Sequence, residues 1–303
     1  MLQKNEEQIS AQIYEDFGKT KQDLEEYIEI LKTWTKTQTH FPEEPSYRVL
    51  RFVIIYNKFS IEKAKQRLDM YYTIRGLMPE FFKNGPFTPG MEMHMKQWQI
   101  LPLPKPTEDH KRILYHKLNP EYGDPKYFDH GKQLSCILNM LEYLILEDIS
   151  YRIIYILDLE GVTMGHVAKT SPMIIKKAAV IFEKVYANNV SKIYLINTPS
   201  YYDTVFNNII LPVTTPKIQG RIKLCSIDTL LEEVGKQNLP EDIGGDQKPL
   251  EELMKDLLQG YEKNRDRYEK LVNLRVDESL RPTKLENDDV LGYYGNFKKI
   301  NVD

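Results

Sequence analysis

The chain has 303 residues, of which 41% are hydrophobic and 28% charged, and its formal net charge is −3. This composition is typical of globular domains and excludes a fibrous or largely disordered protein. The small negative charge argues against nucleic-acid binding, which normally uses a strongly basic face. The two cysteines fit no disulfide framework, and no stretch is long and apolar enough to span a membrane. We therefore expect a cytoplasmic protein, and we expect it to be a monomer.

The first part of the chain has the apolar spacing of amphipathic helices. Within DLEEYIEILKTWTKTQ, apolar residues recur at Leu24, Ile28, Leu31 and Trp34. A further helix is predicted after Ser60, a residue type that often caps helices. The segment 85–106 is rich in proline, which predicts an irregular connection.

The next part of the chain alternates between short β-branched or aromatic runs and helical patterns. The predicted strands are 112–118, 152–159, 192–198 and 221–226. The clearest helix begins with Ser171, a capping residue, and Pro172 at the first helical position. This alternation predicts an α/β fold with a largely parallel sheet. The last strands could instead pair antiparallel at an edge.

Polar residues follow the second predicted strand in the sequence DLEGVTMGH. Asp158 and Glu160 project from one face of an extended chain, and His166 comes shortly after. Ligands of open α/β sheets bind at the carboxyl ends of strands, so acid–base chemistry is one interpretation. The other is a structural corner in which the acids bond to loop amides or to a lysine. The sequence lacks the common catalytic motifs and metal-ligand spacings, so we favour the corner and predict no catalytic residue, metal or cofactor.

The segment 200–213, SYYDTVFNNIILPV, is apolar on more than one helical face. A helix of this kind is either fully buried or contacts something apolar besides its own sheet. It is therefore an ordinary core helix or a lid over an apolar cavity.

Five collinear pieces of the sequence resemble the CRAL-TRIO lipid-binding family, in particular the branch of alpha-tocopherol transfer protein and cellular retinaldehyde-binding protein. They span roughly residues 45–245 and read VLRFVIIYNKFSIEKAKQRL, ILDLEGVTMGHVAKTSPMIIKKAAVIF, IYLINTPSYYDTVFN, KIQGRIKL and LPEDIGG. The ending LGYYGNFKKINVD resembles the tail of many insect members.

The resemblance implies an N-terminal helical bundle followed by a CRAL-TRIO α/β domain. In this family a mostly parallel sheet forms the floor of an apolar pocket. A gate helix closes the pocket and opens at a membrane. The segment 200–213 matches that gate, and DLEG matches a strand end rather than a catalytic centre. We expect a helical domain over 1–90, the lipid-binding domain over 91–250, and a C-terminal helix and tail packing on the domain over 251–303.

The resemblance also implies which residues line the ligand pocket. Ser135 and Asn139 lie one helical turn apart, and they could bond either the ligand's polar end or backbone groups within their own helix. The full set of expected pocket residues is Ser135, Asn139, Ile153, Leu157, Ala178, Ile181, Phe182, Ile193, Val205, Phe206 and Ile209.

Lys217 and Arg221 match basic residues that bind phosphoinositide head groups in tocopherol transfer protein, whereas Asn189 and Ser191 replace two other basic positions. The implied function is an intracellular carrier that binds one retinoid, tocopherol, carotenoid or similar isoprenoid lipid. It would exchange this ligand at the surface of membranes. The alternative function is a phosphoinositide-responsive regulatory or adaptor module.

Overall fold

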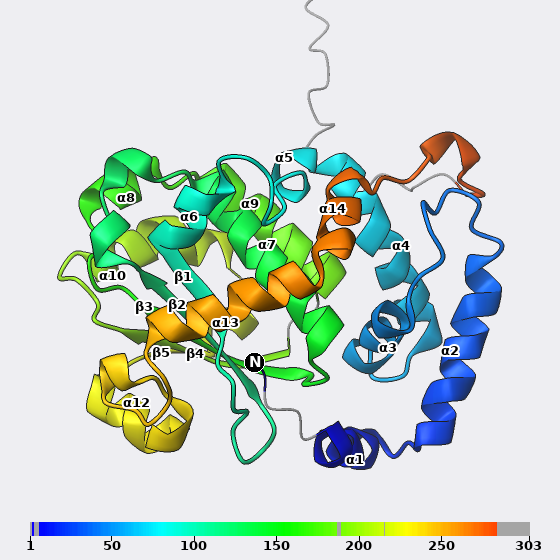
Figure 1. The fold of residues 1–303 in the computed structure, drawn as a ribbon, viewed down its shortest axis with the longest axis horizontal. Coiled ribbons are helices and arrows are strands. Elements are labelled where there is room, and N and C mark those ends of the chain that lie inside the picture. The colour runs from blue at the N-terminus through cyan, green and yellow to red at the C-terminus, as the bar shows by residue number, and fades with distance from the viewer. Residues whose placement is uncertain (1, 3–5, 187–188, 215, 284–303) are drawn as a thin grey trace, which may run out of the picture.

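The computed structural model describes residues 2, 6–186, 189–214 and 216–283, and within these ranges the side chains of Ile209, Val213 and Lys217 are not described. The N-terminal helices are α1 (Glu6–Phe17), α2 (Lys21–Thr35), α3 (Tyr47–Tyr56) and α4 (Ile61–Leu77). Figure 1 shows α2, α3 and α4 together at the right of the molecule. Leu24, Ile28 and Leu31 are buried along one face of α2, so the apolar spacing in the sequence correctly identified the packed side of this helix.

The segment that follows is more regular than the sequence suggested. It contains α5 (Pro79–Phe82), α6 (Met91–Gln97) and β1 (Trp98–Pro102), so the prediction of an irregular connection over 85–106 is wrong for the stretch 91–102. Gly90, with φ of 85°, turns the chain into α6. β1 is an edge strand paired antiparallel to its neighbour, and Pro102 is its last residue. A proline is tolerated at such a position because one side of an edge strand makes no ladder hydrogen bonds.

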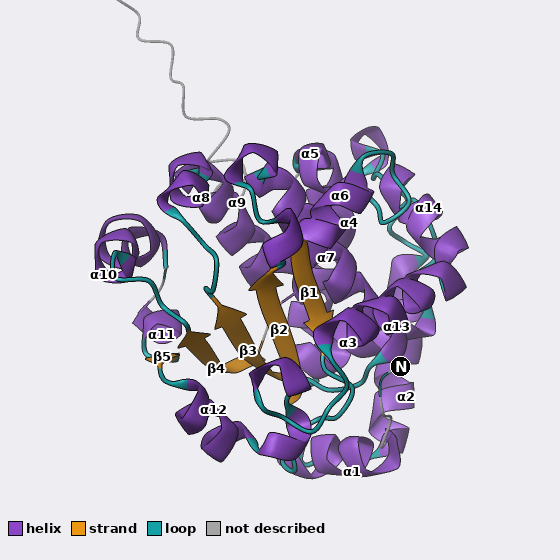
Figure 2. Ribbon diagram, turned by 60° about the vertical axis from the view of Figure 1, so that its left-hand side comes forward, coloured by secondary structure: helices purple, strands orange, loops and turns teal. Residues whose placement is uncertain are grey.

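The sheet has five strands in the order β1-β2-β3-β4-β5, and all of its pairs beyond the first are parallel. Figure 2 shows these strands side by side, with helices on both faces. The prediction of an α/β fold with a mostly parallel sheet is confirmed, and the antiparallel strand is the first one rather than the last. The parallel strands are β2 (Arg112–Leu118), β3 (Arg152–Asp158), β4 (Asn189–Ile196) and β5 (Ile222–Leu224).

The connections between the parallel strands are helical. α7 (His130–Glu147) joins β2 to β3, while α8 (Met164–Lys169), α9 (Pro172–Ile181) and the π-helical turn η3 (Phe182–Tyr186) join β3 to β4. The last connection contains α10 (Tyr202–Val205), η4 (Phe206–Ile210), η5 (Leu211–Val213) and α11 (Pro216–Gln219). The chain then forms α12 (Ile227–Val234), α13 (Leu250–Lys263) and α14 (Arg265–Asn273). Single helical turns are η1 (Pro120–Tyr122), η2 (Pro125–Tyr127), η6 (Lys236–Asn238), η7 (Glu241–Ile243) and η8 (Glu278–Leu280).

The two faces of the sheet are covered by different helices. On one face, His116 of β2 contacts Gln133 of α7, with 3.2 Å between the two Nε2 atoms. On the other face, Tyr194 of β4 donates a hydrogen bond of 2.9 Å to Glu233 of α12. Because side chains alternate along a strand, these contacts assign the strand residues to an α7 face or an α12 face, except at the start of β4, where the register with β3 shifts before Lys192.

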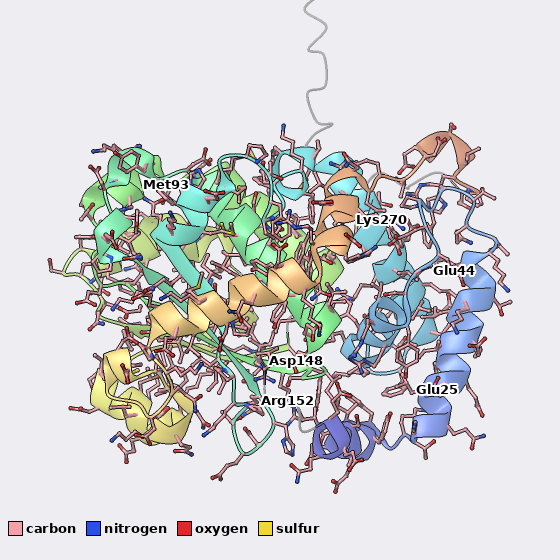
Figure 3. All side chains as sticks on the ribbon, viewed as in Figure 1. Glu25, Glu44, Met93, Asp148, Arg152 and Lys270 are labelled. Atoms are coloured by element: carbon pink, nitrogen blue, oxygen red, sulfur yellow. The ribbon has the colours of Figure 1, made fainter. Side chains whose placement is uncertain are left out.

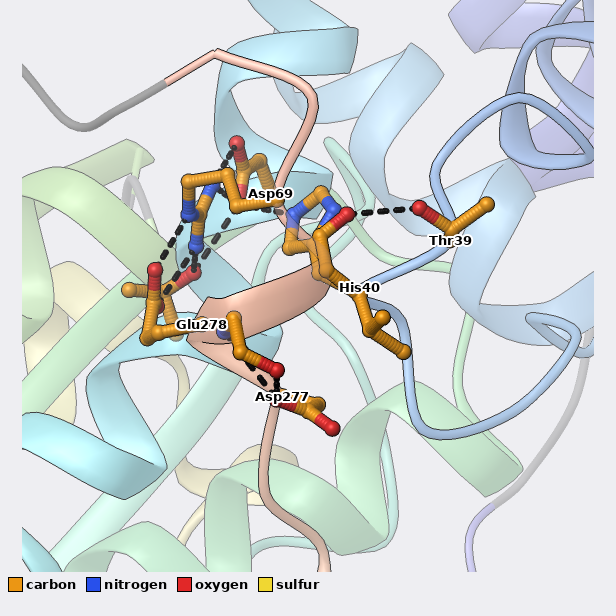
Figure 4. Close-up of polar contacts among 9 residues, drawn as sticks. Thr39, His40, Asp69, Asp277 and Glu278 are labelled. Carbon is orange, nitrogen blue, oxygen red and sulfur yellow. Dashed lines mark hydrogen bonds and ion pairs between the residues drawn. The ribbon is translucent and has the colours of Figure 1, made fainter.

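The segment 277–281, which we call the C-terminal clasp, returns to the N-terminal helices. Arg281 donates to both carboxylate oxygens of Asp69 on α4, at 2.8 and 2.7 Å. The backbone N–H of Asp277 donates to the carbonyl of His40, and the hydroxyl of Thr39 donates to the carbonyl of Leu280 (Figure 4). The end of the described chain is thereby attached to α4 and to the loop after α2.

Candidate ligand-binding site

The α7 face of β3, β4 and β5 is apolar but incompletely covered. The strand register places Leu157 beside Leu195 and Leu224, and it places Ile193 beside Ile222. Leu157, Ile193 and Ile222 are half-buried and Leu224 is 46% exposed, whereas every residue of β2 is buried. A lipophilic ligand lying here would cover apolar surface that the protein core leaves open.

One wall of this site comes from α9 and the π-helical turn that follows it. Ala178 and Phe182 lie one helical turn apart, and both are half-buried at the margin of the core. Ile181 is fully buried in the core itself, so its side chain supports the wall from behind. The α-helix changes to π geometry at Phe182, and such irregular turns are frequent at functional sites.

The predicted gate segment, 200–213, lies beside α9, which its turn η5 contacts. Asp203, Thr204 and Asn207 are exposed, whereas Val205 and Phe206 are half-buried. The polar residues thus form an outer stripe, and the apolar residues point into the molecule. The apolar residues of the gate and of α9 are thus candidates for two sides of one site. Ile209 also belongs to the expected pocket, but its side chain lies outside the described part of the chain.

Ser135 and Asn139 are engaged by the protein rather than open to a ligand. The Ser135 hydroxyl is fully buried and donates to the carbonyl of Phe81 at 2.9 Å, and it accepts from Asn84 at 3.0 Å. The side-chain amide of Asn139 donates to the carbonyl of Asn84 at 2.8 Å. Both residues fix α7 to α5 and to the loop after it. The Ser135 hydroxyl also lies 3.1 Å from the carbonyl of Gly131, so it has a backbone partner within its own helix as well. We therefore leave both out of the proposed pocket.

Ile153 also lies apart from the gate. It is buried at the amino end of β3, where it lines a cavity of about 20 Å³ together with Arg51, Phe52 and Tyr56 of α3. Figure 3 shows the neighbouring Asp148 and Arg152 at the foot of the sheet, beside α1. A cavity of this size holds about one water molecule, so the structure does not join Ile153 to the apolar face described above.

Asp158 forms a buried corner at the carboxyl end of β3. Its carboxylate is fully buried and accepts hydrogen bonds from the hydroxyl of Tyr115 at 2.8 Å and the amide of Asn197 at 2.9 Å. It also accepts from the backbone N–H of Glu160, at 3.0 Å. The carboxylate thus connects β2, β3 and the end of β4, while Gly161 turns the chain with φ of 76°.

The other polar residues of this corner are held in the same way. Lys117 donates to Glu160 at 2.6 Å and lies 3.4 Å from Asp158. Burial lowers the pKa of Lys117, but the hydrogen bond to Glu160 and the charge of Asp158 outweigh it, so the pKa is raised. The Nδ1 of His166 accepts from the backbone N–H of Thr163 and so caps α8. Within the described residues, no group of three histidine, cysteine or acidic side chains could hold a metal ion.

Arg221, one of the two residues expected to bind phosphoinositide, bonds to the sheet in this structure. Its guanidinium donates to the carbonyl of Val190 at the start of β4. Ser191, at a position that is basic in tocopherol transfer protein, donates to the carbonyl of Ile153 at 2.9 Å. The side chain of Lys217 lies outside the described part of the chain.

Some residues of this surface were not singled out from the sequence. Ile222 and Leu224 belong to the floor because β5 aligns with β4, and the strand pattern RIKLCS alone does not fix that register. Tyr202 is half-buried on the inner stripe of the gate. The helical spacing of Tyr202 and Phe206, four residues apart, was the signal that could have found it.

Comparison with known protein families matches two segments of the chain. Residues 98–245 match the model of the CRAL/TRIO domain, and residues 20–88 match that of the Pinta-like UBA domain. The protein therefore contains a CRAL/TRIO domain preceded by a Pinta-like UBA domain. A CRAL/TRIO domain implies binding of a small lipophilic ligand and is typically not catalytic.

Among solved structures, the chain is similar to the crystal structure of Sfh5. The crystal structure of Sfh5 aligns with a TM-score of 0.47 and 12% sequence identity, covering 70% of this chain and 82% of that chain. Comparison with curated proteins gives no match. In the described part of the chain, the helices are all too short or too polar to cross a membrane.

Proposed function

We propose that the protein is a carrier that binds one small hydrophobic molecule and exchanges it with membranes. The observation that carries this proposal is the incompletely covered apolar face of β3, β4 and β5, which lies within a CRAL/TRIO domain. The walls formed by Phe182 and by the inner stripe of the gate, including Phe206, would enclose a ligand on that face.

The surface beside the gate supports contact with an anionic membrane. The segment 161–182 contains three lysines and no acidic residue. Met164 and Met173 of this segment are 53% and 49% exposed, and Lys169 and Lys176 are exposed with them. Figure 1 places α8 near α10, and the hydroxyl of Tyr201 donates to the carbonyl of Val162. Exposed apolar groups among lysines favour binding to a membrane interface with anionic lipids.

The resemblance to the branch of tocopherol transfer protein and retinaldehyde-binding protein narrows the proposed ligand. It favours retinoids, tocopherols, carotenoids and similar isoprenoid lipids. These molecules are long, apolar and weakly polar at one end. The floor residues Leu157 and Ile193 suit such a chain because they offer apolar contact without a charged partner.

The experiment is extraction of the purified protein with organic solvent, followed by mass spectrometry. We expect about one lipophilic molecule per chain, and we expect it to move to liposomes added to the protein. A matched preparation of Phe182→Asp should lose the molecule, because a carboxylate placed on the apolar wall costs free energy on burial. Protein that carries no lipophile, and that takes none up from liposomes of any composition, would contradict the proposal. Liposomes with and without phosphoinositide test the regulatory alternative in the same assay.

A further inference from the structure

The hydroxyl group of Tyr202, at the start of the gate, is buried and has no hydrogen-bond partner among the residues that the structure describes. The adjacent Tyr201 differs, because its hydroxyl donates to the carbonyl of Val162. A buried polar group without a partner destabilises a fold, so such groups are rare in native proteins and often belong to a functional site. The Tyr202 hydroxyl therefore needs an explanation that the packing of the gate does not supply.

The position of Tyr202 on the gate directs its ring inward. Its ring stacks on that of Phe206, with 5.4 Å between centroids and 24° between planes. Both residues lie on the half-buried stripe of the gate, whereas Asp203 and Asn207 are on the exposed stripe. The Tyr202 ring thus belongs to the half-buried side of the gate, together with the ring of Phe206.

The polar side chains of the α7 face and of α7 that could bind a ligand's polar end instead already have partners; these are Tyr155, Ser135 and Asn139. The hydroxyl of Tyr155, on the α7 face of β3, bonds with Nδ1 of His116 at 3.0 Å. The side chain of Ser135 bonds to Phe81 of α5, and that of Asn139 bonds to Asn84 in the loop after α5. Burial, with a smaller contribution from the charge of Asp203, raises the pKa of Tyr202 to about 12, so the phenol is neutral near pH 7. A neutral phenol can both donate and accept a hydrogen bond.

We propose that the hydroxyl of Tyr202 binds the polar end of the ligand, and that this ligand is a lipophile ending in a hydroxyl or carbonyl group. The inference rests on the proposed carrier function and adds the residue that forms a hydrogen bond with the ligand's polar end. A carboxylate-ended lipid fits less well, because Asp203 places a negative charge next to this position. A pure hydrocarbon would leave the phenol without a partner.

The test compares Tyr202→Phe with the wild-type protein, because this change removes the hydroxyl and retains the ring that stacks on Phe206. The probes are retinol and retinal, and the hydrocarbon control is deoxyretinol, which has the same polyene with a methyl end. Binding is followed by quenching of tryptophan fluorescence. We expect Tyr202→Phe to weaken binding of retinol and retinal about tenfold, as for loss of one buried hydrogen bond, and to leave deoxyretinol binding within about twofold. An equal change for all three probes would overturn the role of Tyr202.

A second measurement does not depend on which lipophile is bound. In the empty protein, Tyr202→Phe removes a buried group that has no partner, so its melting temperature should equal or exceed that of wild type. The matched control Tyr201→Phe should melt at a lower temperature, because its hydroxyl has a partner. A lower melting temperature of empty Tyr202→Phe would show that its hydroxyl is used by the protein, and the inference would fail. Failure of the carrier function is a different result, in which wild type binds no lipophile.

Discussion

Arg75 of α4 and Glu142 of α7 form an ion pair in which Nη2 and Oε1 are 2.5 Å apart and both side chains are buried. Glu142 also accepts hydrogen bonds of 2.8 Å from the hydroxyls of Tyr71 and Tyr186. These residues belong to α4, α7 and η3, so one carboxylate holds the helical region against the CRAL/TRIO domain. A buried charge that loses its partner is strongly destabilising, which makes this joint sensitive to small changes.

We expect Glu142→Gln to lower the free energy of unfolding by about 3–5 kcal/mol, because it leaves the Arg75 guanidinium buried without a counter-charge. Urea denaturation followed by circular dichroism measures the change. The control is Glu29→Gln, which removes the exposed partner of Lys32 and should cost less than about 1 kcal/mol. Equal effects of the two substitutions would show that the buried pair does not hold the joint.

At the strand-end corner, Asp158→Asn should destabilise the protein by about 3 kcal/mol, because the buried carboxylate accepts bonds from Tyr115 and Asn197. Glu160→Gln should cost less than about 1 kcal/mol, because the Glu160 side chain is 59% exposed. Thermal unfolding ranks the two variants. The reverse ranking, or a substrate turned over by wild type and not by these variants, would restore the catalytic interpretation.

We expect the free energy of unfolding to decrease as the pH falls below about 6.5, at pH values still too high to protonate most carboxylates. Burial lowers the pKa of His116 to about 3, so this imidazole stays neutral in the folded protein. In the unfolded chain it takes up a proton near pH 6.5. The stabilising effect of the neutral form is therefore complete above about pH 6.5 and is lost progressively as the pH falls toward 3.

The variant His116→Gln checks this dependence. Urea unfolding at several pH values between 7 and 4 should give a shallower slope than in wild type, by up to about 1.4 kcal/mol per pH unit. The comparison concerns slopes, so a uniform loss of stability does not affect it. Parallel slopes would mean that His116 is protonated in the folded state, against its burial beside Tyr155 and Gln133.

Ligand transfer to liposomes should depend more on the gate's apolar side chains than on the basic pair. Each basic group near an anionic surface contributes about 1 kcal/mol, whereas one large apolar side chain of the gate contributes about 1.5–3 kcal/mol when the gate opens and the side chain is buried in the membrane. We expect Phe206→Ala/Ile210→Ala to slow transfer more than Lys217→Ala/Arg221→Ala, with or without phosphoinositide. Transfer that requires phosphoinositide and is lost in the charge variant alone would favour the regulatory alternative.

The sequence predicted those elements whose signals are local. Apolar periodicity located α2, and β-branched runs located β2, β3 and β4, because these signals repeat within one element. β1 was missed because the prolines around it mark turns in most contexts, and only the pairing with β2 makes Trp98–Pro102 a strand.

Candidate-site residues were harder to predict because their partners are distant in the chain. The spacing of Ser135 and Asn139 would allow both to bond a ligand's polar end. In the structure they bond instead to Phe81 and Asn84, which lie more than fifty residues earlier in the chain. The alternation within β3 correctly pairs Ile153 with Leu157 on one face, but it does not reveal that α3 covers only the first of them.

The C-terminal clasp also sets an order of events during synthesis. Asp69 leaves the ribosome 212 residues before Arg281, the side chain that neutralises it, and the whole CRAL/TRIO domain is made in between. A nascent chain can therefore form its sheet and the Arg75–Glu142 joint before the contact between Asp69 and Arg281 exists. A premature stop codon just ahead of Arg281 would leave all five strands in the chain but remove the guanidinium that pairs with Asp69 on α4.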